Sequence, residues 1–259
     1  MNQSNYFKHI LLKKCIIFYG KIIEINILRN IFSIIIDEGK FTTIADIFLD
    51  RIIRFTIFIL YPFKGILSEE SKQIKNINWI IDPLDGTRSY VNRYKGYVIQ
   101  ACRLESGIVV ESIIYAPAFD KCFSFLEGDS PRENDEIISK PIDKKSKIRI
   151  IDNYPSPNGI IKYLYENINN SSYVESGSLS MKSLYVCLGY ADIFVKDVLV
   201  RDWDVAPIIP FLKLRDCIMR DINGCEFKIN PLSYEKKGLV VCSSFLSEKL
   251  FSLINAYYD

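Results

Sequence analysis

The sequence has very little histidine: His9, close to the start, is the one histidine in 259 residues. This scarcity excludes Ser-His-Asp and Cys-His catalysis and metal sites built on several histidines. The seven cysteines are odd in number and form no CxxC pair, so neither a disulfide framework nor a zinc site is indicated. Scattered cysteines of this kind are typical of the reducing cytoplasm, which is the location that the sequence predicts.

Long hydrophobic runs are absent as well. The chain is 49% hydrophobic, which is ample for a sizeable core, but charged residues interrupt the apolar first thirty positions. The apolar stretch at 55–63 is too short to span a bilayer, which takes about eighteen or more apolar residues in a row. We therefore expect no stable membrane insertion.

An excess of charge of either sign is also lacking, since 33 basic and 31 acidic residues give a net charge of +2. This balance offers no argument for nucleic acid as a partner. The length suits one large domain or two packed halves. The polar, charge-rich segment 129–147 is the best candidate for a boundary, which predicts an N-terminal half at 1–145 and a C-terminal half at 146–259.

Apolar periodicity predicts that helices and strands are mixed along the whole chain. Helices are expected at 7–36, 45–60, 158–168, 179–190, 204–214 and the C-terminus. Strands are expected at 65–71, 78–87, 97–128, 148–152, 191–196 and 238–244. In the 45–60 helix, the residues expected on the core side are Ile47, Leu49, Ile52, Ile53 and Phe55.

Two of the predicted strands end in acids: Glu69 and Glu70 follow one, and Asp82 and Asp85 follow the other. Carboxylates without histidine or cysteine nearby are the ligands that Mg²⁺ prefers. A crowded group of this kind repels itself unless divalent cations and a substrate phosphate fill it, and Thr87 is placed to orient a metal-bound water. Taken singly, each motif also fits an ordinary alternative, a solvated acidic pair or a common turn.

The order of the motifs narrows the choice. The segments that carry it are TTIAD (42–46), GILSEES (65–71), WIIDPLDGT (79–87), SGSLSMKSLYVCLGYADIF (176–194) and RDWDVAP (201–207). Together they resemble the inositol monophosphatase superfamily, which comprises Mg²⁺-dependent, lithium-sensitive phosphatases of small phosphorylated metabolites. The resemblance covers almost the whole chain, and DPxDGT followed by WDxA is highly specific. The chain departs from the family where KFTT replaces SPVT and where FLKLRD replaces an acidic-Ala-Gly-Gly turn.

The resemblance implies the layered α/β/α/β/α fold of sugar phosphatases, with an N-terminal α+β half and a C-terminal α/β half that share the metal site. It implies two or three Mg²⁺ ions, held by Glu69, Asp82, Asp85, Asp204 and the carbonyl of Leu84. Catalytic roles fall to Glu69, Thr87 and Asp46, with Asp46 orienting Thr87 or holding a further metal. The implied reaction is in-line attack by a metal-activated water, with the amides of Gly86 and Thr87 holding the phosphate.

The substrate is less well defined by the sequence. Ser68, Leu84 and Arg88 resemble the 3'(2'),5'-bisphosphate nucleotidase branch, whose substrate is 3'-phosphoadenosine 5'-phosphate. Asp197 and Arg201 instead resemble the inositol monophosphatases, in which an acid at this position holds substrate hydroxyls.

Ser178 and Lys182 are candidates for contacts with a nucleotide or a second phosphate, although Lys182 equally fits an exposed helix position. The nucleotidase is the leading interpretation, since fold alone does not decide substrate. An inositol monophosphatase, another sugar or histidinol phosphatase, and a non-catalytic binding relative remain as alternatives. The expected partner is a small phosphorylated metabolite, and a homodimer is left open.

Overall fold

The computed structural model describes residues 3–71, 77–139, 147–230 and 233–259. Within it the chain forms two compact units, an N-terminal unit of residues 1–138 and a C-terminal unit of residues 139–259. The boundary that the sequence predicts, after residue 145, falls on residues 140–146, which lie outside the described residues.

The N-terminal unit is built on a seven-stranded sheet with the order β3-β4-β5-β6-β7-β8-β9. Its strands are β3 (Gly65–Ser68), β4 (Ile77–Asp85), β5 (Val98–Glu105), β6 (Ile108–Ala116), β7 (Lys121–Leu126), β8 (Arg132–Glu133) and β9 (Glu136–Ile137). β3 and β4 are parallel, and each later neighbour is antiparallel. A separate antiparallel pair joins β1 (Ile35–Asp37) to β2 (Thr42–Thr43).

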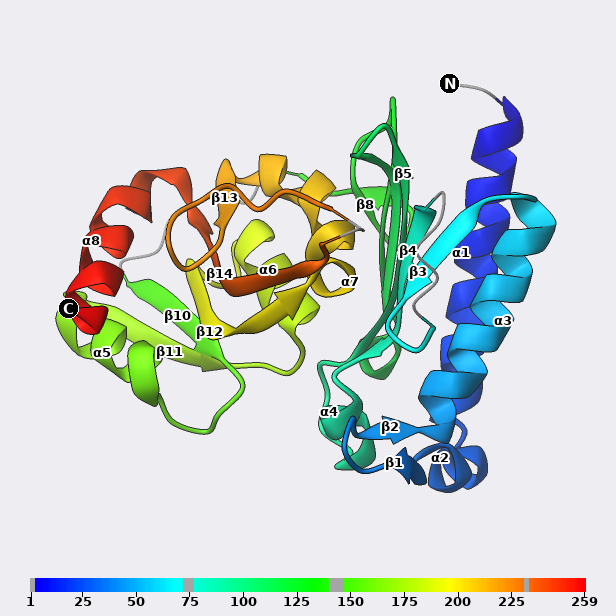
Figure 1. The fold of residues 1–259 in the computed structure, drawn as a ribbon, viewed down its shortest axis with the longest axis horizontal. Helices are drawn as coiled ribbons and strands as arrows, with labels where there is room; N and C mark the ends of the chain where they lie inside the picture. The colour runs from blue at the N-terminus through cyan, green and yellow to red at the C-terminus, as the bar shows by residue number, and fades with distance from the viewer. Residues whose placement is uncertain (1–2, 72–76, 140–146, 231–232) are drawn as a thin grey trace. The chain divides into compact units, whose positions relative to one another are not determined.

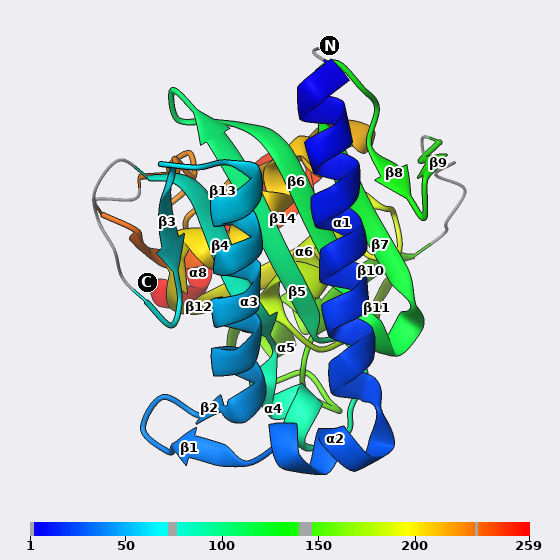
Figure 2. The ribbon, with the colours of Figure 1, turned by 90° about the vertical axis from the view of Figure 1, so that its right-hand side faces the viewer.

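Two long helices, α1 (Gln3–Glu24) and α3 (Ile44–Leu60), lie across one face of this sheet (Figure 2). Because side chains alternate along a strand, Trp79 and Ile81 of β4 both face the helices and are fully buried there. The shorter elements of the unit are α2 (Asn26–Phe32), α4 (Thr87–Val91) and the 3-10 helix η1 (Pro117–Phe119).

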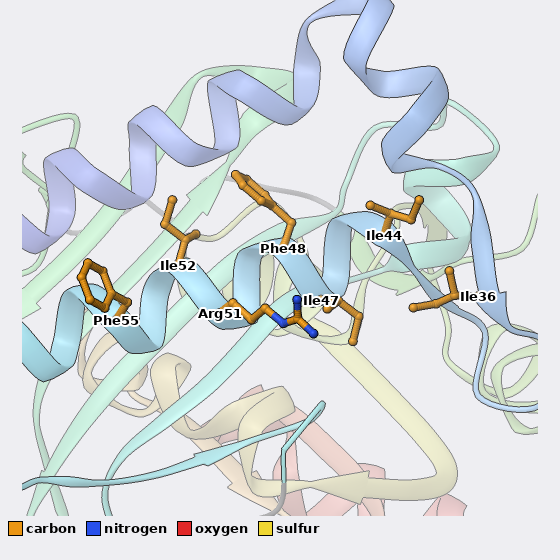
Figure 3. A pocket seen from close by; sticks show the side chains of 7 residues that line it. All are labelled: Ile36, Ile44, Ile47, Phe48, Arg51, Ile52 and Phe55. Atoms are coloured by element: carbon orange, nitrogen blue, oxygen red, sulfur yellow. The ribbon is translucent and has the colours of Figure 1, made fainter.

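The core face of α3 differs in part from the prediction. Leu49 and Ile53 are fully buried, as expected, whereas Phe55 is 63% exposed, so its assignment to the core is wrong. A helix turns by about 100° per residue, which places Phe55 on the side opposite Ile53. Figure 3 shows Phe55 lining a surface pocket along α3, together with Ile47 and Ile52, which are only half-buried.

The C-terminal unit contains a five-stranded sheet with the order β11-β10-β12-β14-β13. Its strands are β10 (Ile148–Asp152), β11 (Ser171–Glu175), β12 (Ile193–Arg201), β13 (Cys217–Arg220) and β14 (Glu235–Ser243). β11, β10 and β12 are parallel, and β14 pairs antiparallel with both β12 and β13.

Helices cover both faces of this second sheet. α5 (Gly159–Asn167) and α8 (Ser247–Tyr258) lie side by side (Figure 1) and share a core with Ile193 and Val195 of β12. α6 (Leu179–Cys187) packs on the opposite face, where Phe194 points. The α/β class that the sequence predicts is therefore confirmed.

The predicted helix at 204–214 needs a correction. A short helix α7 (Asp202–Val205) leads into a 3-10 helix η2 (Ala206–Leu214), so Asp204 is the third helical residue and not the first. Pro207 and Pro210 explain the change, since neither can donate the backbone hydrogen bond that an α-helix requires. A further 3-10 helix, η3 (Ser244–Leu246), precedes α8.

Two expectations about the environment of the chain can be compared with the structure. All seven cysteines lie in the described part of the chain, and each is a free thiol. Among the described helices, none has the length and apolarity needed to cross a membrane. The cytoplasmic location and a homodimer stay predictions.

Candidate functional site

The acids singled out in the sequence lie at one edge of the seven-stranded sheet. β3 and β4 run parallel, so the chain leaves both strands at the same edge. There the backbone N–H of Glu69 donates to the carbonyl of Ile81, 3.3 Å away, which places Glu69 beside the start of the Asp82 segment. The carboxyl ends of parallel strands are where open α/β sheets bind ligands.

An irregularity in strand pairing at the end of β4 affects how the backbone presents Asp82 and Asp85. The pairing of β4 with β5 shifts between Asp82 and Asp85, and the amide of Leu84 donates to Asp82 Oδ1 at 3.1 Å. Asp82 is 1% exposed and Asp85 is 8% exposed. Gly86 then adopts a left-handed φ of 94° immediately before α4, which a residue with a side chain rarely does.

Thr87 and Asp46 meet through a hydrogen bond. The Thr87 hydroxyl lies 3.0 Å from Asp46 Oδ1 and 3.0 Å from the carbonyl oxygen of Leu84. Asp46 is the third residue of α3, and its other oxygen accepts the backbone N–H of Thr43 at 2.8 Å. The structure therefore places the Thr87 hydroxyl between a carboxylate and a main-chain carbonyl.

Two carboxyl groups at this edge have raised pKa values. The pKa of Glu70 is raised to about 7, first by burial and then by the negative charges of Asp46, Glu69 and Asp50, while Lys40 acts against the shift. Burial also raises the pKa of Asp46, although hydrogen bonds from Thr43 and Thr87 oppose the change. The neighbouring negative charges therefore disfavour the ionised form of Glu70, and a cation would relieve that cost.

Asp50 is a member of this group that the sequence analysis missed. It is buried on α3, one turn after Asp46, and accepts a hydrogen bond of 2.6 Å from the hydroxyl of Ser68, the last residue of β3. The signal was present in the sequence, because residues four apart lie on the same face of a helix.

The donor set of this edge suits a hard divalent cation. The side chains of Glu69, Asp82 and Asp85 and the carbonyl of Leu84 offer only oxygen, which is the chemistry of Mg²⁺. In the described part of the chain, however, no three His, Cys, Asp or Glu side chains converge closely enough to form a metal cage by themselves. These residues suit Mg²⁺ because all their donor atoms are oxygen and because they lie at the same edge of the sheet. Among the described residues they do not form a closed coordination shell.

Asp204 lies in the C-terminal unit and is 8% exposed. Its Oδ2 accepts the backbone N–H of Arg201 at 2.7 Å, and its own carbonyl accepts the Ser180 hydroxyl at 2.6 Å. The neighbouring Trp203 is 1% exposed and packs against the Tyr234 ring, with the centroids 5.0 Å apart. These contacts fix the short helix α7 and the position of Asp204 within its unit.

A pair of lysines meets at the carboxyl end of β10. Lys182 Nζ lies 3.4 Å from Asp152 Oδ1, and Lys196 Nζ lies 3.3 Å from the same oxygen. Both ammonium groups also approach Asn153 Oδ1, at 3.3 and 3.2 Å. Two positive groups therefore share one carboxylate oxygen, and we call Lys182 and Lys196 the lysine pair.

The alternative that Lys182 is an exposed helix residue is wrong. It is 2% exposed, and its Nζ lies 5.0 Å from the centre of the Phe194 ring, on the inner side of α6. Lys196 was missed, because its partner Asp152 is 44 residues away in the sequence. The signal that could have found it is the parallel pairing of β10 with β12, which brings the two strands together.

The three other candidate substrate residues of this unit have separate surroundings. Ser178 is the N-cap of α6, and its hydroxyl oxygen accepts the backbone N–H of Met181 at 3.2 Å. Arg201 pairs with Glu235 at 3.3 Å. Asp197 is exposed at an irregularity of β12, where it accepts a hydrogen bond of 3.3 Å from Tyr258.

Comparisons with known proteins give a consistent result. The family model described as the inositol monophosphatase family matches residues 25–258. A 3'(2'),5'-bisphosphate nucleotidase, CysQ of Aggregatibacter actinomycetemcomitans, is 23% identical over 225 residues, which cover 81% of this chain and 81% of that protein.

Two solved structures have a similar fold. The IMPase of Thermotoga maritima superposes with a TM-score of 0.77 at 21% identity, covering 100% of this chain and 98% of that chain. An IMPase/NADP phosphatase complexed with Mg²⁺ and phosphate gives a TM-score of 0.71 at 21% identity, covering 83% of this chain and 82% of that chain.

Proposed function

The chain belongs to the inositol monophosphatase family, whose members are phosphoric monoester hydrolases, and we propose that it is a Mg²⁺-dependent phosphatase of a nucleoside bisphosphate. Specifically, it acts as a 3'(2'),5'-bisphosphate nucleotidase on 3'-phosphoadenosine 5'-phosphate. The observation that carries this choice is the lysine pair, Lys182 and Lys196, which brings two ammonium groups to one carboxylate oxygen of Asp152. A substrate with a second phosphate has an anionic group for these two ammonium groups, whereas an inositol monophosphate has none.

The residues that would hold the metal are Glu69, Asp82, Asp85, the carbonyl of Leu84 and, from the C-terminal unit, Asp204. Their support is the oxygen-only donor set and the raised pKa of the adjacent Glu70, which results from burial and then from neighbouring carboxylates. Bound there, two or three Mg²⁺ ions supply positive charge for the phosphate and the leaving oxygen and lower the pKa of a coordinated water.

Thr87 and Asp46 have the task of orienting the attacking water. The Thr87 hydroxyl donates a hydrogen bond to Asp46 Oδ1, and the two oxygens are 3.0 Å apart. The lone pairs of the hydroxyl oxygen are therefore left to accept a hydrogen bond from water. The contacts of Asp46 with Thr43 fix the carboxylate itself, so that its direction does not depend on substrate. Glu69 is the acid proposed to take the proton that the water loses.

The phosphate that is hydrolysed is expected at the backbone amides of Gly86 and Thr87, where the left-handed turn leads into α4. The second phosphate is expected at Lys182 and Lys196, with Ser178 nearby at the start of α6. Lysine ammonium groups bind phosphate through charge-assisted hydrogen bonds, which are stronger than neutral ones.

One observation favours an inositol monophosphatase as the second candidate. Asp197 is exposed and has a carboxylate suited to accept hydrogen bonds from sugar or inositol hydroxyls. In that case Asp197 and Arg201 would contact the substrate, and the lysine pair would serve only to stabilise the end of β10.

A side-by-side assay tests the choice. Phosphate release from 3'-phosphoadenosine 5'-phosphate, inositol 1-phosphate and fructose 1,6-bisphosphate is measured at equal concentrations, with Mg²⁺ and again with EDTA. The proposal expects Mg²⁺-dependent release that is fastest from the nucleotide. Faster release from inositol 1-phosphate would instead favour the second candidate, and no Mg²⁺-dependent release from any of them would point to a non-catalytic relative.

A further inference from the structure

A second cavity lies within the N-terminal unit and shares no residue with the acids described above. It measures about 410 Å³, within the range of small-molecule sites. Its walls are one face of α1 and the segment that runs from β7 into β8, two parts of the chain that lie side by side in Figure 2. The residues that line it from α1 are spaced three and four apart, as one helix face requires.

Buried polar side chains form the floor of this cavity. His9 and Lys13 line it and are each 4% exposed. His9 Nδ1 lies 3.0 Å from Glu111, which is fully buried and also accepts from Arg103 at 2.9 Å. Since a carboxylate bonded in this way acts as an acceptor, His9 Nδ1 is the donor, and Nε2 is the ring nitrogen left for a ligand.

The loop that forms the opposite wall is held in place by its own contacts. Arg132 donates to both oxygens of Asp129, at 3.0 and 3.2 Å, and to the carbonyl of Asp135 at 2.7 Å. Asn134 is tied to Cys122 of β7 by hydrogen bonds of 2.8 Å in both directions. The wall is therefore formed before any ligand arrives.

The charges of the lining do not cancel. Arg132 pairs with Asp129, and Lys13 pairs with Asp135. Both carboxyls stay ionised, because these cations lower the pKa of Asp129 and of Asp135. Lys14 is exposed at the rim, and no ion pair with the described residues balances it. The cavity therefore keeps one positive charge beside the neutral donors Tyr6, Ser124 and Ser130.

The remaining lining is apolar, from Ile10, Ile17 and Leu126. We propose that this cavity is a binding site for a small organic anion, a carboxylate or phosphate whose apolar part rests on these side chains. Lys14 donates to the anionic oxygens of this group, and His9 Nε2, which is an acceptor when Nδ1 donates to Glu111, accepts from a protonated oxygen such as that of a singly protonated phosphate. This cavity shares no residue with the proposed catalytic site. The proposal therefore does not depend on which substrate the enzyme hydrolyses.

The scarcity of histidine makes the proposal directly testable, because His9 gives the single histidine signal of the untagged protein. Phenylphosphonate serves as the probe and is titrated at fixed pH, in EDTA, into protein with ¹³C-labelled histidine. The proposal expects a saturable shift of the His9 ring resonance. Sodium chloride at matched ionic strength should not reproduce it, and benzyl alcohol should bind at least several-fold more weakly.

Variants locate the effect. Lys14→Ala removes an exposed side chain and should weaken phenylphosphonate binding by about 10-fold, as expected for one charged hydrogen bond. Lys21→Ala, an exposed lysine on the same helix but outside the cavity, is the matched control and should bind as wild type. An unmoved His9 resonance, a shift that sodium chloride reproduces, or wild-type binding by Lys14→Ala would overturn the proposal.

Discussion

The acids at the end of β3 and β4 and the lysine pair at the end of β10 form a contrast in charge. In the N-terminal unit, burial and then the charges of neighbouring carboxylates raise the pKa of Glu70 to about 7. In the C-terminal unit, Lys182 and Lys196 gather around the one carboxylate of Asp152. Like charges that are partly buried are costly unless something of the opposite sign is bound. We therefore propose ligands of opposite charge for the two regions, a metal cation at the acids and an anionic group at the lysines.

The largest expected effect comes from neutralising one acid. Asp85→Asn should lower kcat by on the order of 10³-fold, because a ligand of the catalytic metal is lost. In EDTA the variant should melt at the wild-type temperature or above it, since one source of repulsion is removed. Thermal melts and turnover with and without Mg²⁺ check both parts. Glu38→Gln, an exposed acid of the same unit, is the control, and a variant that keeps wild-type turnover and the Mg²⁺-dependent melting shift would contradict the assignment.

A smaller loss is expected at the hydroxyl that Asp46 holds. Thr87→Val removes the group that orients water while keeping its shape, so kcat should fall by on the order of 10²-fold. Thr87→Ser keeps the hydroxyl and should retain most of the activity. A Thr87→Val variant that is as active as Thr87→Ser would contradict the role of the hydroxyl.

The pH dependence of stability tests the crowding directly. Glu70 has a folded pKa of about 7 against an ordinary value of 4.5, so the folded state binds more protons between these values. The metal-free protein should therefore lose stability as pH rises from about 4.5 to about 7, with no further loss from this group above that range. Melting temperatures in EDTA at pH 5, 6, 7 and 8 should show a weaker fall for Glu70→Gln than for wild type. Asp202, whose pKa is also raised by burial, contributes equally to both proteins. If melting temperature falls with pH equally in wild type and Glu70→Gln, the raised pKa of Glu70 would be contradicted.

The smallest effect concerns monovalent cations. Li⁺ is similar in radius to Mg²⁺ but carries half the charge, so it should occupy a site among Glu69, Asp82 and Asp85 without supporting turnover. We expect lithium chloride to inhibit at concentrations at which sodium chloride at equal ionic strength does not, since screening acts alike for both salts. Initial rates in the two salts make the comparison. Equal inhibition by the two salts would contradict the prediction of lithium sensitivity. The prediction of Mg²⁺ dependence would not be affected.

The parts of the site that the sequence predicted are local in the chain. Asp82, Asp85 and Gly86 lie within five residues at a strand end, and α4 begins directly after them at Thr87. What was missed depends on packing between distant segments. Lys196 joins the site only because β12 pairs with β10, and Lys182 is buried only because α6 packs over Phe194.

Helix faces were predicted less well than helix positions. The 45–60 helix is present as α3, yet Phe55 points away from the core although its hydrophobicity suggested otherwise. Asp50 shows the reverse error, since a charged residue on the inner face was not considered part of the acid group. Hydrophobicity alone identifies a helix better than it identifies its buried side, because a buried polar residue can be satisfied by hydrogen bonds such as the one from Ser68.

We propose that the lysine pair selects a substrate with a second phosphate. The most direct test is a ratio of kcat/KM values for two nucleotides that differ only in that phosphate. This ratio compares kcat/KM for 3'-phosphoadenosine 5'-phosphate with kcat/KM for adenosine 3'-monophosphate, in wild type, Lys182→Met and Lys196→Met. Methionine keeps the length of the side chain and its packing, and Lys162→Met on the exposed face of α5 is the matched control. The account predicts that each lysine variant lowers the ratio by roughly 10- to 100-fold, the worth of one charged hydrogen bond, while the control leaves it unchanged. A ratio that stays at the wild-type value in both lysine variants would contradict the claim.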